Sequence, residues 1–435
     1  MSALGSALAE RLTAEHADTA AALAEPPASA ATRRRALAAL LASGLPTSRD
    51  ENWKYANLRP LEKLRYLPAS IAAPAAAPVT AAALPAALPG HARYVFVDGV
   101  LAPALCAPLA ATAATLTLRA GAPASPPSTS ADERFALLNA AFAVQSIEVR
   151  LAASSSAQLE LLFVAGSDAA QGACYPRVQL EVEAGARLAL VERHLSAAEA
   201  PSFVNSAVTV ALDAGASLSH YRLQDLSSRS IQLDTLTASL GPRAVYRLHA
   251  AATGGQSARS TMKVRLAGER AELAFGMAAL GDRHQVQDIY ALVEHAAPGA
   301  RSEQIFRGIA AARSRVAFNG KIVVAAGAHG ADSRQSLKGL LAGPDAEIDV
   351  RPQLEIYTDD VRCSHGATAG KLDEQMLFYL LSRGLSPQDA QRLLKWAFLG
   401  DVIARTDLPA LRRQIEARLA GQLRDEALRE LTDGS

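Results

Sequence analysis

The sequence is short of the residue types that mark several large classes of protein. Its 435 residues include only three cysteines, Cys106, Cys174 and Cys363, which lie far apart. Three scattered thiols do not make a disulfide framework, and they are typical of a protein in a reducing compartment. Aromatic residues make up only 5% of the chain, which argues against a sugar-binding groove lined with stacking rings.

A strong charge of one sign is also missing. The 44 basic and 43 acidic residues leave a formal net charge of +1. Because binding to the phosphate backbone needs a large basic field, nucleic acid is not an expected partner.

No segment has the pattern of a membrane span or of a secretory signal. The uncharged runs 66–90 and 99–118 are rich in alanine and are interrupted by prolines, whereas a spanning helix needs about 20 predominantly apolar residues. Glu10 and Arg11 lie where the apolar core of a signal peptide would fall. We therefore expect a cytoplasmic protein with no membrane partner.

The chain begins with a helical pattern. Residues 1–45 are rich in Ala, Leu, Glu and Arg, which favour helix, and Gly44 is a typical helix end. The basic run Arg33–Arg35 is predicted to be a solvated helix face. Trp53 is predicted to dock this region onto its neighbour. We assign residues 1–67 to an N-terminal helical domain.

An alanine- and proline-rich segment follows at 68–130, and its composition indicates a stiff linker. Within it, residues 94–101 alternate in polarity around Asp98-Gly99, which predicts a hairpin with a two-residue turn. Apolar residues at helical spacing then predict a short helix over 132–143.

From 145 to 365 the apolar residues recur with a period of two, which indicates strands. Glycine-containing turns recur as well, and those at 183–186 and 213–216 lie thirty residues apart. Many short strands with recurring turns predict a β-solenoid, a barrel or a sandwich, and the pattern alone does not choose among them. No helical pattern separates the strands, which argues against βαβ units.

Helical patterns return at the C-terminal end. A helix is predicted over 373–383, and a second begins at Ser386-Pro387, a capping serine followed by proline at the first helical position. The apolar stripe of the second helix is predicted to pack and consists of Ala390, Leu393, Leu394, Ala397 and Phe398. We expect these helices to cap the end of a solenoid, whose edges need protection.

The third helical stripe is either a packed face or a ridge that binds a partner, and packing is the preferred interpretation. Its members are Leu408, Leu411, Ile415, Leu419 and Leu423.

The candidate site residues are Cys363 and His365. Two residues apart on a strand, their side chains share one face, and a thiolate beside an imidazole suits iron, zinc or copper. Two ligands do not complete a coordination sphere, so a second surface would have to supply the rest. The alternative is that the pair is incidental and Cys363 only packs. Asp359 and Asp360 are expected on opposite faces, so they do not form an acid–base pair.

The segment that carries these residues also carries a family resemblance. QLEIYTDDVRCSHGATAGKLDEQMLFYLLSRG, at 353–384, resembles the C-terminal signature of the SufD family, the scaffold subunits of the SUF iron–sulfur assembly complex. The motifs at 51–55, 293–295 and 332–335 are similar to that family in the same order. Leu380 stands where SufB-like sequences have a cysteine, which favours SufD over the related principal scaffold.

The resemblance implies a mainly β protein. Its core would be a right-handed parallel β-helix over 131–365, flanked by the helical domain 1–67 and a C-terminal helical domain over 366–435. It also implies a non-catalytic subunit that pairs with SufB through the β-helix. A strand edge suited to SufB could also form a homodimer when SufB is absent.

The resemblance further implies the cofactor and the second partner. His365 and Cys363 would contact a nascent iron–sulfur cluster at the interface with SufB, and no cluster would be held stably by this chain alone. The chain has no Gly-x-x-x-x-Gly-Lys-Ser/Thr motif for ATP, and the resemblance implies that the ATPase SufC docks on the C-terminal helices, where we expect Leu394 and Phe398 to bind it.

Two alternatives remain open on the sequence. One is a SufB-like principal scaffold. The other, from a different class, is a β-helix polysaccharide-active enzyme, which would need a groove of carboxylates with a basic residue or bound calcium.

Overall fold

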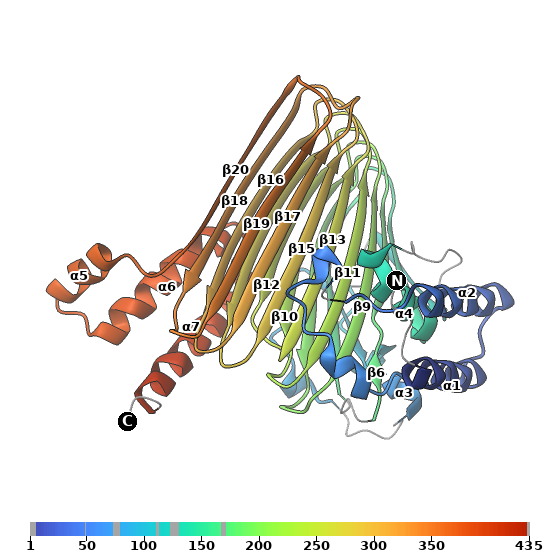
Figure 1. Cartoon of the computed structure of the whole chain (residues 1–435). Helices are drawn as coiled ribbons and strands as arrows, with labels where there is room; N and C mark the ends of the chain where they lie inside the picture. The colour runs from blue at the N-terminus through green and yellow to red at the C-terminus, as the bar shows by residue number, and fades with distance from the viewer. Residues whose placement is uncertain are drawn as a thin grey trace.

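Most of the chain forms a tall stack of strands with helices on two sides, as the computed structural model shows (Figure 1). The structure describes residues 6–47, 49–72, 79–109, 113–121, 130–166 and 171–432. Successive long strands alternate between two sheets, so that each sheet is built from every second strand. Pairing within each sheet is parallel except at its N-terminal end. The chain is therefore a parallel β-solenoid, which confirms the fold class that the resemblance implied.

The strand order defines the two sheets. Sheet I runs β2 (Val100–Leu101), β1 (Ala92–Val97), β5 (Ser156–Ala165), β8 (Arg187–Ser196), β10 (Ser217–Asp225), β12 (Val245–Ala252), β14 (Glu272–Gly281), β16 (Arg301–Ala310), β18 (Ala331–Leu341), β20 (Val361–Gly370). Sheet II runs β19 (Glu347–Ile356), β17 (Arg315–Val324), β15 (Val286–His295), β13 (Ser257–Leu266), β11 (Ile231–Leu240), β9 (Phe203–Leu212), β7 (Arg177–Val182), β4 (Gln145–Leu151), β3 (Ala114–Ala120), with β6 (Ala173–Cys174) beside β9.

The interior of the solenoid is filled by alternate residues of both sheets. Leu218, Tyr246 and Leu273 occupy equivalent positions on three neighbouring strands, and all are buried. This is the inward half of the period-two pattern. Such burial removes apolar area from water at every turn and stabilises the stack.

At one corner of the solenoid, successive turns each have a residue in the left-handed backbone conformation. Gly185 and Gly215 both have φ of +67°, and the Gly185 N–H donates to the Ala214 carbonyl at 3.0 Å. The recurring glycine turns are thereby confirmed as stacked corners. Arg243 and Arg270 occupy the same corner with φ of 57° and 56°, so the geometry is kept even without glycine.

The N-terminal helices lie against sheet II. They are α1 (Ser6–Ala22), α2 (Pro27–Ser43), α3 (Ala69–Ala72) and α4 (Arg134–Phe142). Single turns of 3-10 helix cover Glu51–Trp53, Arg59–Lys63, Ala81–Ala83, Pro103–Leu105 and Ala131–Glu133. The helical pattern over 1–45 is divided because Pro27 opens a new helix. Trp53 is 1% exposed in the shared core, as expected of a docking residue.

The prediction for the basic run is wrong at one position. Arg33 is fully buried, where its Nε lies 2.9 Å from Glu25 Oε1. Arg34 and Arg35 are exposed, as predicted. The helix turns its residues by about 100° each, so one member of a run of three faces the core.

The segment 68–130 contributes strands to both sheets. β1 pairs in parallel with β5, and β3 pairs antiparallel with β4. The predicted hairpin is confirmed as β1 and β2, with Asp98 and Gly99 at positive φ in the turn. The short antiparallel strands cover the N-terminal end of each sheet.

The C-terminal helices lie on the opposite side of the stack from the N-terminal ones (Figure 1). They are α5 (Glu374–Ser382), α6 (Pro387–Ile403) and α7 (Pro409–Thr432). The apolar stripe of α7 is a packed face, which was the preferred interpretation: Leu411 is fully buried against the outer face of sheet I. The expected cap over the solenoid end is wrong, because α6 and α7 cover the face of sheet I and α5 buries none of its residues. None of the described helices is both long and apolar enough to cross a bilayer.

Candidate functional site

Both candidate residues lie on β20, the last strand of sheet I. β20 pairs with β18 along its whole length, and no described strand pairs with its other edge. β19 ends sheet II in the same way. The C-terminal mouth of the solenoid, defined here as the ends of β19 and β20, is therefore an open pair of strand edges.

Cys363 and His365 point toward the interior at this mouth. Cys363 is in register with Ser333 and His365 with Gln335, and both of those β18 residues are buried in the interior. Cys363 is half-buried against the central core, whereas His365 is exposed. The two side chains share one face, as their spacing predicts, and a second protein can reach both.

The surroundings of Cys363 keep its thiol protonated. Burial and the nearby Asp332 carboxylate raise the pKa of the Cys363 thiol, and a hydrogen bond to the Ser333 backbone only partly offsets this. A thiolate here needs a cation, which lowers the pKa of a coordinating thiol.

The donor set is one sulfur and one imidazole nitrogen. Among the described residues no three His, Cys, Asp or Glu side chains group so as to hold a metal ion. Soft thiolate and imidazole ligands fit iron, and the residues present supply part of a coordination shell at a surface. The role of these residues in binding stays a prediction.

The prediction that Asp359 and Asp360 lie on opposite faces of a strand is wrong. Asp359 and Asp360 lie in the loop between β19 and β20 and not on a strand. Glu355 forms an ion pair with Lys321 at 2.6 Å.

Beneath the two candidates, polar residues replace apolar ones in the interior. The Ser302 hydroxyl lies 2.8 Å from the Ser333 hydroxyl and 2.8 Å from His295 Nε2. Beside them, Gln335 donates to Gln304 at 3.3 Å. These residues were not predicted as part of a site, although 293–295 and 332–335 were noted as motifs. Polar residues at the inward parity of a strand were the signal that could have found them.

A second polar cluster lies deeper in the solenoid. Glu192 accepts hydrogen bonds from His194 at 2.6 Å and His220 at 3.0 Å, and it pairs with Arg222. All four side chains are buried. These histidines are hydrogen-bonded residues of the core, which is what single histidines in strands usually are.

The apolar stripe of α6 is oriented differently from the prediction. The residues that pack on sheet I are Leu399, Val402 and Ile403, at the i, i+3, i+4 spacing, whereas Leu393 is 45% exposed. Leu394 and Phe398 are half-buried. The sequence contains two overlapping stripes, and the sheet selects the one nearer the C-terminal end of the helix.

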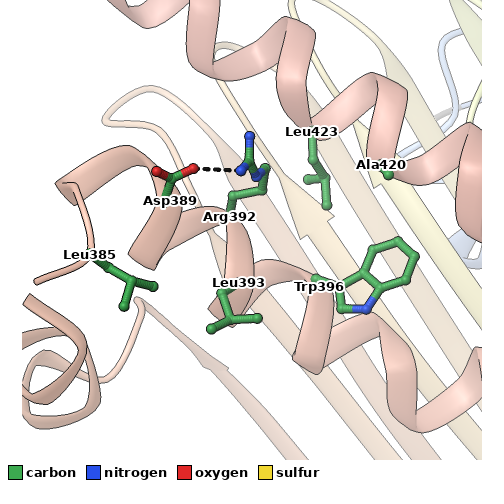
Figure 2. Close-up of a pocket in the computed structure, with 7 residues that line it drawn as sticks. All are labelled: Leu385, Asp389, Arg392, Leu393, Trp396, Ala420 and Leu423. Atoms are coloured by element: carbon green, nitrogen blue, oxygen red, sulfur yellow. Dashed lines mark hydrogen bonds and ion pairs between the residues drawn. The ribbon is translucent and has the colours of Figure 1, made fainter. Parts of the chain in front are cut away.

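Leu393 and Trp396 of α6 form one wall of a groove between α6 and α7 (Figure 2). The groove has a volume of about 640 Å³ and is mainly apolar. Its lining residues are Leu385, Asp389, Arg392, Leu393, Trp396, Ala420 and Leu423. On the neighbouring α5, Met376, Phe378 and Tyr379 are exposed. Together these side chains make an exposed apolar surface of the kind that binds other proteins.

Comparisons with known proteins agree on one family. Residues 163–398 match the family model described as SUF system FeS cluster assembly, SufBD core domain. The chain is 31% identical over 390 residues to the iron–sulfur cluster assembly protein SufD of Escherichia coli (strain K12), covering 88% of this chain and 90% of that protein. It is 28% identical over 404 residues to an iron–sulfur cluster assembly SufBD family protein of Synechocystis, with 88% and 89% covered. A chloroplastic protein of Arabidopsis thaliana, ABCI7, is 28% identical over 250 residues, 57% of this chain and 53% of that protein.

Proposed function

This chain belongs to the SufBD family of iron–sulfur cluster assembly proteins, and from that premise we propose that it is a non-catalytic SufD-type subunit. It would act in a cytoplasmic complex with SufB and the ATPase SufC. The observation that carries the proposal is the position of His365 and Cys363 at the open mouth of the solenoid, where a partner can reach both. Family membership supports this role over that of a polysaccharide-active enzyme.

His365 is proposed to donate a ring nitrogen to iron of the nascent cluster, which is the substrate of the complex. Cys363 would add a thiolate once iron is present, because the cation favours loss of the thiol proton. SufB would supply the remaining ligands. In the absence of that partner two donors are too few to retain a cluster.

The open edges of β19 and β20 support pairing with SufB. Unpaired strand edges present backbone donors and acceptors that readily pair with another chain. β20 contains four small residues in its last five, at 366–370, so a second strand can approach closely. The same edge would allow a homodimer when SufB is absent.

The groove between α6 and α7, with the exposed face of α5, supports docking of SufC. The turn that follows α6 is tied to sheet I by an ion pair between Arg405 and Glu303 at 2.7 Å. Glu303 lies on β16, two strands from β20 in the same sheet. If ATP binding to SufC moves α6, only two strand pairs, β16–β18 and β18–β20, separate this contact from the mouth.

The first test replaces His365. Co-expression with SufB and SufC should give an intact complex with His365→Ala, but its cluster absorbance and iron content should fall several-fold because one ligand is lost. Ser364→Ala, an exposed neighbour on the same strand, is the matched control and should retain the parent cluster content. Full cluster content with His365→Ala would remove His365 from the site.

The second test addresses SufC. Leu393→Asp places a charge in the groove without touching the packed face of α6, so the chain should fold normally while SufC co-purification falls at least about tenfold. Gln388→Asp, exposed on the same helix, should have no effect. Unchanged SufC recovery with Leu393→Asp would move the docking surface elsewhere. Leu394 and Phe398 are the adjacent positions to test next, with the folded state checked because both are half-buried.

A further inference from the structure

Gln335 lies directly beneath His365 in the interior of the solenoid. The register of β16, β18 and β20 aligns Gln304, Gln335 and His365 on one inward-facing column. Neighbouring strands are about 4.8 Å apart, so side chains at paired positions of one face are within contact range. The next residue of the column, Phe275, is apolar. The polar pair is thus confined to the two turns below the mouth.

The carboxamide nitrogen of Gln335 has a hydrogen-bond partner, and its oxygen has none. Its Nε2 donates to Gln304 Oε1 at 3.3 Å, whereas no described group bonds to its Oε1. Gln335 is only 4% exposed. A buried acceptor without a partner is destabilising, so this oxygen is expected to have a partner in the working protein.

The opposite sheet leaves room for the glutamine pair. Gly320 on β17 faces it, and a Cβ on Gly320 would lie 2.8 Å from Gln335 Nε2 and 3.4 Å from Gln304 Oε1. A side chain at position 320 would fill the space that the pair occupies, and the hydrogen bond to Gln304 sets the direction of the Gln335 carboxamide. Gln335 has a defined orientation, which is what a group that positions another side chain requires.

We propose that Gln335 positions His365, by accepting a hydrogen bond from one ring N–H of the imidazole on its open Oε1. The other ring nitrogen then faces the mouth with its lone pair free. Among the described residues nothing else holds the ring of His365, although histidines that bind metals usually donate their second nitrogen to a carbonyl or carboxylate. The inference rests on the proposed role of His365 and adds to it the residue that selects the ring tautomer.

Two purely structural roles of the glutamine pair lead to a different result. The pair could serve only to fix the strand register, or a buried water could satisfy Oε1. In either case replacing Gln335 would change the stability of the fold but not the ring of His365. The tautomer of His365 is therefore the measurement that separates positioning from these structural roles.

The experiment uses the full chain with ¹⁵N-labelled histidine at pH 8, where ring nitrogen shifts report the ratio of the two neutral tautomers. His365→Ala identifies the signal. Gln335→Met keeps the volume and removes the acceptor, and the tautomer ratio is expected to change roughly fivefold, the value of one hydrogen bond of about 1 kcal/mol. Gln287→Met is the matched control: Gln287 is an inward-facing glutamine on β15, 1% exposed, whose Nε2 donates to the Gly254 carbonyl at 2.6 Å.

An unchanged ratio in Gln335→Met, or an equal change in Gln287→Met, overturns the inference. If Gln335→Met does not fold, Gln335→Glu keeps an acceptor at the same place and should hold or strengthen the parent ratio; a fivefold shift away from it overturns the inference equally. The measurement needs no cluster and no partner. A shifted ratio with full cluster content in His365→Ala would contradict the proposed function while leaving the positioning intact.

Discussion

Arg33 carries a positive charge inside the N-terminal helical region, where each of its three guanidinium nitrogens donates to an oxygen atom. Its guanidinium pairs with Glu25, and it also donates to the carbonyls of Ala141 and Ala143 at 2.7 Å each. Ala141 lies in the last turn of α4 and Ala143 is its C-terminal cap, so neither carbonyl has a partner N–H within the helix. One side chain thus neutralises a buried carboxylate and completes a helix end.

Replacing Arg33 should strongly destabilise the chain. Arg33→Met leaves the Glu25 carboxylate, 4% exposed, without its cation, and loss of one partner of a buried pair costs about 3–5 kcal/mol. Urea unfolding at neutral pH would measure this change. Arg34→Met, on the exposed side of the same turn, should change the free energy of unfolding by less than about 0.5 kcal/mol. Equal effects of the two variants would contradict the structural role of Arg33.

The C-terminal helices are held to sheet I by an apolar face that includes a neutral histidine. His249 lies on the outer face of sheet I beneath α6 and α7, stacked on Tyr221 with ring centroids 5.8 Å apart. Burial lowers the pKa of His249 from 6.5 to about 4, with Asp407 raising it and Arg405 and Arg247 lowering it. The helices therefore dock on an uncharged imidazole.

Acid should weaken this docking. The unfolded chain takes up a proton at His249 near pH 6.5 and the folded chain only near pH 4, so the free energy of unfolding falls as the pH drops between these values. The maximum loss is roughly 3 kcal/mol. Unfolding measured from pH 7 to 4.5 should show a smaller decline in His249→Gln, while exposed His329→Gln should follow the parent. Burial also lowers the pKa of His295. His295 therefore accounts for part of the pH dependence of unfolding that remains in His249→Gln.

At the scale of the whole molecule, the two ends of the solenoid differ. The N-terminal end is covered by the antiparallel strands β2 and β3. At the C-terminal end β19 and β20 have no such cover among the described residues, and α5 extends away from them (Figure 1). Open edges of this kind favour association, so the end that carries Cys363 and His365 is also the end where the proposed pairing would take place.

An inward-pointing charge at this edge should block association. Ala367→Lys places an ammonium group at the exposed mouth, and charges directed inward on an edge strand prevent edge-to-edge pairing. Sedimentation of the full chain without SufB should show self-association at least about tenfold weaker than in the parent, equal to about 1.4 kcal/mol. Ala214→Lys, at an exposed corner, is the control. A parent that is monomeric at all concentrations, or a variant that associates equally, would contradict the proposed homodimer.

Local patterns in the sequence were sufficient to identify many of the helices, strands and turns. The alternation of apolar residues identified the strands, Asp98-Gly99 identified the hairpin, and Ser386-Pro387 identified the start of α6, where the Ser386 hydroxyl accepts from the Asp389 N–H at 3.1 Å. Each of these depends on residues within a few positions of one another. The spacing of Cys363 and His365 likewise determined that they share a face.

What the tertiary structure decided is which neighbours each face meets. The sequence of α6 holds two apolar stripes, and only contact with sheet I selected Leu399 and Val402 for burial. The burial of Arg33 and the placement of Gln335 under His365 depend on residues far apart in the chain. The sequence determined the strands, the turns and the pairing of a thiol with an imidazole, because these follow from backbone periodicity. The open mouth and the polar column beneath it follow from stacking of turns about thirty residues apart, which no local pattern encodes.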